Sequence, residues 1–250
     1  AWEFYATLPK QPFMQKSGLA ADPDTIAGQI LGYQALAMVL DNQNERAIKK
    51  VRDIDATGYK SVDLYRYGLA AAQNAQDTTA ILEFAQKGYD NFGTEEMSFI
   101  GQLINVNLMH NDFAACERLV KEAINAQPAP DAATMAQLYS ILGTIQEQNN
   151  QLDEAYSNFK KAVEINPDFA KGYYDQARII FNKALKMDEE ADDAARQSTV
   201  NPQFLEAAKL FEKAYNMDPD TLTNIPGILY RLYYRVEGAE GANTKAWENK

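Results

Sequence analysis

Apolar residues recur every three or four positions along most of this chain, which is the spacing of helices with one buried face. The clearest example starts at Ala136, where two such segments meet at the polar turn Asn149–Gln151. Pro167 follows the second segment, and proline ends a helix because it lacks a backbone N–H donor. The pattern predicts two amphipathic helices joined by a short turn and closed by a proline.

The residue sizes in these two segments predict how the helices pack. Gly143 in the first helix and Ala155 in the second are small enough to let the two backbones approach closely. Phe159 follows Ala155 by one helical turn and fills the space beside the glycine, and Ala162 avoids a clash one turn further on. Each residue type therefore has a steric reason for its position.

Weaker copies of the same series lie on both sides of this pair. They begin at Gly28, Ser61, Met97 and Ala170. In the second copy, Lys87 occupies a position where a small residue is usual, and the last copy carries an insertion of about residues 188–203 between its halves. A final apolar segment over residues 223–236 predicts a helix that covers the last pair.

This series resembles the tetratricopeptide repeat family, whose unit has about 34 residues. The residues that carry the resemblance are Tyr139, Leu142, Gly143, Ala155, Phe159, Ala162 and Pro167. It implies an all-α fold, a right-handed α-solenoid of about five tetratricopeptide-like helix pairs with a C-terminal capping helix. A helical bundle with accidental spacing is the alternative, and the recurrence of the series in register disfavours it.

The solenoid is expected to span residues 24–236. Residues 1–23 are too rich in proline for a long helix and too apolar for a solvated tail, so we expect them to pack on the first pair. Residues 237–250 are expected to form a frayed tail, although Trp247 could dock on the capping helix. The insertion continues the helical stripe through Ala184 and Ala191, which predicts longer helices that project from the body and are dispensable for folding.

Composition narrows the possible partners. The chain has 24 Lys and Arg against 35 Asp and Glu, a formal net charge of -11, which on average repels nucleic acids and anionic membrane surfaces. Its longest apolar stretches, such as Ala35–Leu40, are far shorter than the roughly 20 residues of a membrane-spanning helix. No basic segment followed by an apolar core opens the sequence, so a signal peptide is either absent or already removed.

Candidate chemistry is sparse, and we expect no enzymatic activity, no cofactor and no metal site. The single His110 falls at a predicted turn, and the single Cys116 falls where the repeat requires a small residue. Neither residue has the partners of a catalytic or zinc site. The acidic run Asp188–Asp193 lacks the alternating ligands and central glycine of a calcium loop, so it is better explained as a solvated helix face.

The family resemblance implies a concave groove lined by the first helix of each pair. The candidate groove residues are Tyr33, Tyr65, Arg66, Gln102, Asn105, Gln137, Lys171, Tyr174 and Arg178. Tyrosine offers a large rigid contact area and arginine pairs bidentately with carboxylates, so the set predicts a scaffold that binds a protein or peptide, such as an acidic or C-terminal peptide. Two alternatives remain: these are ordinary solvated polar residues, or the protein is a structural assembly subunit that binds through its convex face or ends.

The last predicted pair also bears on location. A lengthened last pair followed by a Tyr-rich apolar helix, here Leu229–Tyr234, is similar to envelope or secreted repeat proteins of Bacteroidetes-type bacteria. This likeness implies a periplasmic or cell-envelope location, with the cytoplasm as the alternative.

Overall fold

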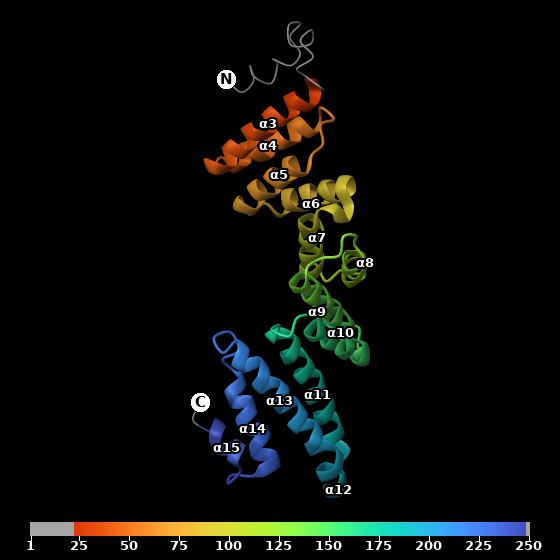
Figure 1. Ribbon diagram of the computed structural model, residues 1–250, viewed down its shortest axis with the longest axis vertical. Helices are drawn as coiled ribbons and strands as arrows, with labels where there is room; N and C mark the ends of the chain where they lie inside the picture. The colour runs from red at the N-terminus through yellow and green to blue at the C-terminus, as the bar shows by residue number, and fades with distance from the viewer. Residues whose placement is uncertain (1–22, 249–250) are drawn as a thin grey trace. The chain divides into compact units, whose positions relative to one another are not determined.

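The computed structural model describes residues 23–248 and, over this range, consists of helices and their connecting turns (Figure 1). The chain divides into two compact units between Pro128 and Ala129, called here the N-terminal and C-terminal units. Consecutive helices pack against each other within each unit. The expected packing of residues 1–22 lies outside the described residues.

From residue 23 onward, the N-terminal unit contains three helix pairs, each formed by neighbours in the sequence. The pairs are α3 (Pro23–Leu40) with α4 (Asn44–Asp55), α5 (Val62–Asn74) with α6 (Thr78–Phe92), and α7 (Met97–Met109) with α8 (Phe113–Ile124). A single 3-10 turn, Gly93–Glu95, connects the second pair to the third. Helix α3 also contacts α5, so the first helices of adjacent pairs lie next to each other.

The C-terminal unit contains two further pairs and the predicted capping helix. Its elements are α9 (Ala132–Gln148), α10 (Leu152–Ile165), α11 (Ala170–Glu190), α12 (Asp193–Ala195), a π-helical turn (Arg196–Val200), α13 (Asn201–Met217), α14 (Ile225–Glu237) and α15 (Ala242–Trp247). Helix α9 pairs with α10, α11 pairs with α13, and α14 packs on α13. The predicted all-α fold of paired helices with a capping helix is confirmed.

The turn inside four of the pairs has the same backbone conformation. One residue in each turn has a positive φ between 56° and 59°, and three of these four are asparagine, a residue that tolerates the left-handed region. The residues are Asn42, Gln76, Asn111 and Asn150. In two of the pairs the next residue is an aspartate, Asp77 or Asp112, whose carboxylate caps the following helix by accepting a backbone N–H at 3.0 Å. The repeat therefore extends to its turns.

Paired helices approach closely where glycine faces phenylalanine. A Cβ atom placed on Gly143 would lie 2.7 Å from the Phe159 ring, and one placed on Gly68 would lie 2.9 Å from the Phe84 ring. Both rings are fully buried. The predicted packing of the fourth pair is thus confirmed, and the second pair uses the same contact.

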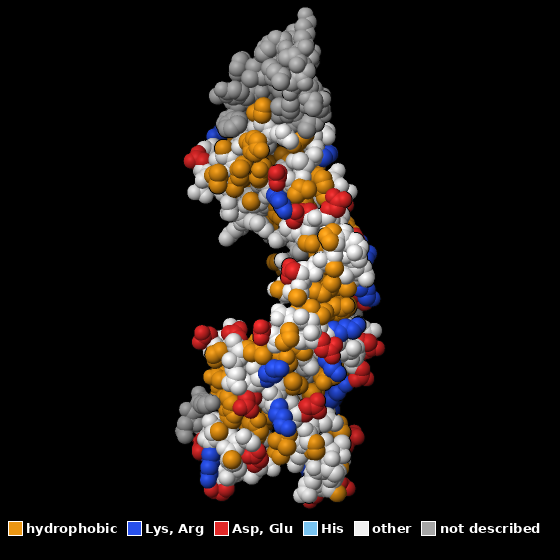
Figure 2. Space-filling model, in the orientation of Figure 1, with side chains coloured by type: hydrophobic (Ala, Val, Ile, Leu, Met, Phe, Trp, Pro, Cys, Tyr) orange, Lys and Arg blue, Asp and Glu red, His pale blue; other side chains and the backbone are white. Residues whose placement is uncertain are grey.

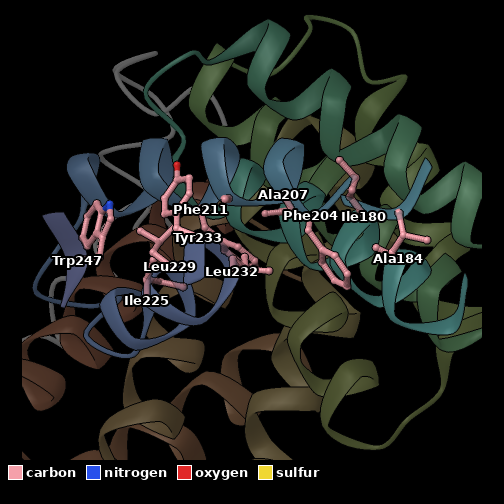
Figure 3. Close-up of a cluster of buried hydrophobic side chains, with 13 residues drawn as sticks. Ile180, Ala184, Phe204, Ala207, Phe211, Ile225, Leu229, Leu232, Tyr233 and Trp247 are labelled. Atoms are coloured by element: carbon pink, nitrogen blue, oxygen red, sulfur yellow. The ribbon is translucent and has the colours of Figure 1, made fainter. Parts of the chain in front are cut away.

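The core of the C-terminal unit continues to the end of the described chain. Figure 3 shows side chains from α11, α13, α14 and α15 in one buried cluster. Trp247 is buried in it and makes an edge contact with Tyr215, with ring centroids 5.6 Å apart. Residues 242–247 therefore form a helix that packs on the core, and the expectation of a frayed tail is wrong for them. The docking of Trp247, which the sequence analysis considered, is observed.

The insertion lengthens α11 to Glu190, as the sequence predicts, but its last residues pack on the core instead of projecting from the body. Val200 is only 1% exposed and belongs to the same buried cluster as Ala184 and Phe204. Asp188 accepts hydrogen bonds from Arg196 at 3.1 Å and from Arg235 of α14 at 2.5 Å. The helical pattern of the sequence does not predict the burial of Val200. The π-helical turn departs from the 3.6-residue period and so changes which residues point toward the core.

The glycine contact can be tested by adding bulk. Gly143→Leu should lower the free energy of unfolding by about 1–3 kcal/mol, because the new side chain overpacks against Phe159. Gly227→Leu in α14 is the matched control, since a Cβ there meets open space. Urea denaturation of both variants checks this, and equal midpoints for Gly143→Leu and the parent would refute the proposed packing.

The role of the insertion can be tested at Val200. Val200→Ala should cost about 1–2 kcal/mol of stability, because it leaves a cavity in the cluster. The exposed neighbour Thr199→Ala should change stability by less than about 0.5 kcal/mol. Thermal or urea unfolding distinguishes the two, and a neutral Val200→Ala would show that the insertion is peripheral after all.

Candidate functional site

All nine candidate groove residues lie on the first helices of their pairs, as the sequence predicts, but they differ in what their side chains contact. Five belong to the N-terminal unit and four to the C-terminal unit. The exposed ones are Tyr33, Arg66, Asn105, Gln137 and Lys171, and the half-buried ones are Gln102, Tyr174 and Arg178. Tyr65 is fully buried.

Tyr65 cannot line a groove, which corrects the prediction for this residue. Its ring lies between helices, 6.2 Å from the Phe92 ring and 6.5 Å from the Phe99 ring. Its hydroxyl donates a hydrogen bond of 2.6 Å to Asp55, at the end of α4. The side chain therefore joins α4, α5 and α7, and no partner can reach it.

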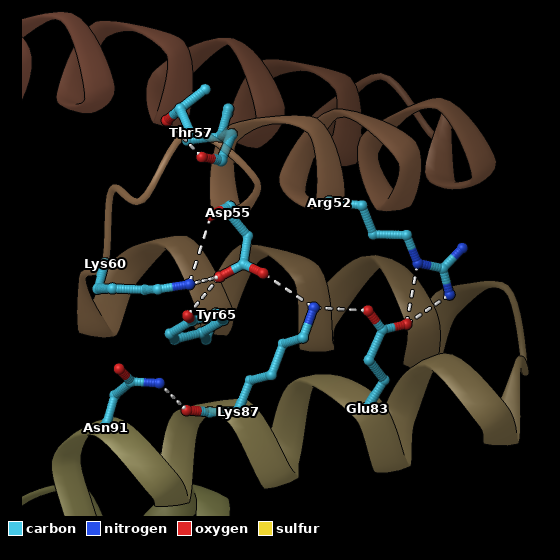
Figure 4. Close-up of polar contacts among 9 residues, drawn as sticks. Arg52, Asp55, Thr57, Lys60, Tyr65, Glu83, Lys87 and Asn91 are labelled. Atoms are coloured by element: carbon cyan, nitrogen blue, oxygen red, sulfur yellow. Dashed lines mark hydrogen bonds and ion pairs between the residues drawn. The ribbon is translucent and has the colours of Figure 1, made fainter.

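Asp55 is the centre of a polar network that crosses three helices (Figure 4). Lys87 of α6 donates to Asp55 and to Glu83, both at 2.9 Å. Glu83 in turn accepts two hydrogen bonds from Arg52 of α4, at 2.9 and 2.7 Å. This explains why Lys87 stands where the repeat usually has a small residue: its ammonium group bridges the second helices of two adjacent pairs.

The network also fixes the charge of Asp55. Burial alone would raise its pKa, but hydrogen bonds from Lys60, Tyr65 and Lys87 outweigh burial and hold the pKa at about 2. Burial and the nearby Asp55 carboxylate together raise the pKa of Tyr65. An ionised carboxylate with three donors is suited to fixing helices rather than to proton transfer or ligand binding.

In the C-terminal unit, the candidate cations are already paired with carboxylates of their own chain. Arg178 forms a bidentate contact with Glu147 of α9, with Nη2 to Oε2 at 2.7 Å, and a second contact with Asp175 at 3.1 Å. Lys171 also pairs with Asp175, whose side chain is only 4% exposed. Figure 2 shows basic and acidic side chains interspersed over this unit. An incoming carboxylate would have to displace these pairs.

Tyr174 is half-buried and contributes to packing as well as to the surface. Its ring makes an edge contact with Phe211, with centroids 5.6 Å apart, and so joins α11 to α13. In the N-terminal unit, Arg66 pairs with Glu96 of the following pair and with Asp63 at 3.7 Å. Both Tyr174 and Arg66 therefore make contacts within the chain, whereas the groove prediction assumed that they are available to a partner.

A pocket of about 110 Å³ opens between α3 and α5, on the first-helix face of the N-terminal unit. It is lined by Gln29, Gly32, Tyr33, Tyr59, Ser61, Asp63, Leu64 and Tyr67. Tyr33, at 53% exposure, is the most accessible of its large rings. The sequence pattern indicated Tyr33 but neither Tyr59 nor Tyr67. Tyr59 precedes α5 and lies outside any helical stripe, whereas Tyr67 lies on α5 next to Gly68 of the helix contact.

Gly28 makes room for one wall of this pocket, and Tyr67 supplies a hydroxyl group. The Tyr59 ring lies against Gly28, where an added Cβ would come within 2.3 Å of it, so the glycine makes room for the ring. Burial raises the pKa of Tyr67, and the charge of Asp63 raises it further, so its hydroxyl stays protonated at neutral pH. The pocket thus presents tyrosine rings, hydroxyl groups and one carboxylate.

The residues considered for chemistry have structural surroundings. Cys116 is fully buried, and burial raises the pKa of its thiol to about 11. His110 lies exposed at the end of α7. Within residues 23–248, no group of three His, Cys, Asp or Glu side chains could hold a metal ion. Over the same residues, no helix has the length and apolar character needed to cross a membrane.

The fold is that of a helical repeat protein, built from consecutive helix pairs. Residues 136–169 and 169–190 match the family model described as tetratricopeptide repeat. These residues form α9, α10 and α11, which include the Gly143–Phe159 contact. This part of the chain is thus similar to the tetratricopeptide repeat.

Solved structures support the fold over most of the chain. The structure reported for pilF of Pseudomonas aeruginosa has 11% identity and a TM-score of 0.61, and the match covers 90% of each chain. YrrB, described as a TPR protein with an unusual peptide-binding site, has 16% identity and a TM-score of 0.54 over 89% of this chain and 96% of its own. A repeat protein of Cytophaga hutchinsonii has 12% identity and a TM-score of 0.55 over 100% of this chain and 98% of its own. At these identities the likeness concerns the fold alone. No curated protein matches the sequence.

The Asp55 network predicts a pH-dependent contribution to stability. Because the folded pKa of about 2 lies below the ordinary value, the contribution is present at neutral pH and is lost as pH falls from about 4 to about 2. Asp55→Asn should therefore lower the free energy of unfolding by about 2 kcal/mol at pH 7, with a smaller difference at pH 3. Urea denaturation at several pH values measures this.

The control for this experiment is Asp53→Asn, which removes an exposed pair with Lys49 and should cost less than about 0.5 kcal/mol. A loss for Asp55→Asn that stays the same from pH 7 to pH 2 would mean that the carboxylate charge contributes nothing.

Proposed function

We propose that this protein is a non-enzymatic scaffold that binds a protein or peptide partner on the first-helix face of its repeats. The observation that carries the proposal is the tyrosine-lined pocket between α3 and α5. Tyrosine rings supply large contact areas at low entropic cost, and their hydroxyls pair with polar groups of a partner. The description of YrrB as having a peptide-binding site is consistent with such use of a similar fold.

The surface chemistry favours aromatic contact over a track of cations. Arg66, Lys171 and Arg178 each pair with a carboxylate of their own chain, so their attraction for an acidic peptide is reduced. Around the α3–α5 pocket, the exposed Tyr33 ring offers area, while Asp63 and the hydroxyls offer acceptors. The partner that suits this pocket is a peptide with a flat or apolar side chain and a nearby hydrogen-bond donor.

We also propose a periplasmic or cell-envelope location, on the basis of the lengthened last pair and the Tyr-rich α14. Fractionation of cells that express the protein would test it, and recovery in the cytoplasmic fraction alone would contradict it.

Binding can be tested by selecting short random peptides from a display library on the full chain. Tyr33→Ala should weaken the selected peptides by about tenfold or more, because it truncates the exposed ring at the pocket. Leu82→Ala on α6 is the matched control, since Leu82 is an exposed large side chain of the same unit but of a second helix. Fluorescence anisotropy gives the affinities.

If Tyr33→Ala binds the peptides as tightly as the parent and Leu82→Ala binds them more weakly, the proposal of binding on the first-helix face is wrong. That result would favour the alternative, an assembly subunit that binds through the opposite face.

A further inference from the structure

The C-terminal unit contains a second groove, formed by elements that an ordinary repeat lacks. Its volume is about 260 Å³, and its lining residues are Phe181, Leu185, Phe204, Ile228, Arg231, Leu232 and Arg235. The walls come from the lengthened α11 and from the capping helix α14, and the floor comes from α13. We call it the α11–α14 groove.

The groove is apolar inside. Phe181 and Leu185 lie one turn apart on α11, and Leu185 is 41% exposed although it is a large apolar residue. Phe204 and Leu232 belong to the buried cluster of Figure 3, so the groove is the open edge of the core. An exposed apolar hollow with a rigid floor is a feature that partner side chains fill.

The polar groups among the lining residues are two arginines. Arg235 is held in place: its guanidinium lies 4.8 Å from the centre of the Phe204 ring and donates to Asp188 at 2.5 Å. Arg231, one turn earlier on α14, is exposed and has no ion pair or hydrogen bond with the described part of the chain. One arginine is thus already neutralised, while the other is available to a partner.

This charge distribution is unusual for the molecule. The chain carries a net charge of -11, and its other groove cations, such as Lys171 and Arg178, are paired internally. No acidic residue lines the α11–α14 groove, and Asp188 outside it is occupied by Arg196 and Arg235. An unpaired cation beside an apolar hollow selects for a partner that has both an apolar group and a negative charge.

We propose that the α11–α14 groove binds a linear peptide segment in which a bulky aliphatic or aromatic side chain is flanked by Asp or Glu. The apolar side chain enters the hollow above Phe204, and the carboxylate pairs with Arg231. Because the chain carries a net charge of -11, an acidic peptide is on average repelled elsewhere on the surface, which favours binding at this groove. The groove is smaller than the roughly 300–1,000 Å³ of most small-molecule pockets, so side chains of a peptide suit it better than a whole cofactor.

This proposal goes beyond the function proposed above, since it concerns another unit, other residues and a partner that carries Asp or Glu instead of a hydrogen-bond donor. If this proposal is wrong, the proposal for the α3–α5 pocket still stands. The Tyr33→Ala experiment tests the α3–α5 pocket and not the α11–α14 groove.

The test uses three matched sets of short synthetic peptides on the full chain. The first set places Phe or Leu between Asp or Glu residues, the second replaces the acidic residues by Lys, and the third replaces Phe or Leu by Ser. Members of the first set should bind at least about tenfold more tightly than their counterparts, with an affinity that falls as salt rises. Fluorescence anisotropy and calorimetry measure the binding.

Two variants place the binding at the groove. Arg231→Glu reverses the free cation and Leu185→Ser removes an apolar wall, and each should weaken the first set by about tenfold or more. Lys209→Glu on α13 makes the same change of charge at an exposed position outside the lining, and it should bind as the parent does. Circular dichroism and thermal unfolding confirm that all three variants are folded.

The proposal is overturned if no member of the first set binds more tightly than its Lys counterpart. It is also overturned if the binders are unaffected by Arg231→Glu and Leu185→Ser, or if Lys209→Glu weakens them equally, because the attraction would then depend on general charge and not on this groove.

Discussion

The close approach of paired helices, made possible by glycine facing phenylalanine, is the constraint on which the rest of this structure depends. Gly143 against Phe159 and Gly68 against Phe84 bring two backbones to a separation that a larger residue would prevent. Once these two pairs are fixed in this way, their outer faces are fixed as well and can pack on the neighbouring pairs. The fold is thus assembled from local contacts between helices close in sequence.

Adjacent pairs are then joined by polar contacts that use most of the available charges. Asp55, Lys87 and Glu83 connect the first two pairs, and the Arg178–Glu147 contact connects the fourth pair to the fifth. These groups hold helices in register, so Arg178 contributes less to recognition than its position on a first helix suggests. What remains for partners is the tyrosine pocket between α3 and α5 and the apolar α11–α14 groove.

The two candidate surfaces differ in chemistry because their elements differ. The α3–α5 pocket is formed by the ordinary repeat with Tyr59 contributed by a connecting segment, and it offers rings, hydroxyls and a carboxylate. The α11–α14 groove depends on the lengthened α11 and the capping helix, and it offers an apolar hollow and Arg231. The two proposed sites lie in separate units and would accept two kinds of peptide.

The sequence by itself determined the helix pairs, their turns, the capping helix and the Gly143–Phe159 contact, because these depend on residues less than one repeat apart. It also placed all nine candidate residues on first helices. Only the tertiary structure decided that Tyr65 is buried, that Arg178 is neutralised by Glu147 and that Val200 of the insertion belongs to the core. The physical reason is that a first helix adjoins both its own partner and the next pair, so the helical period shows which residues share a face but not whether that face meets solvent or another helix.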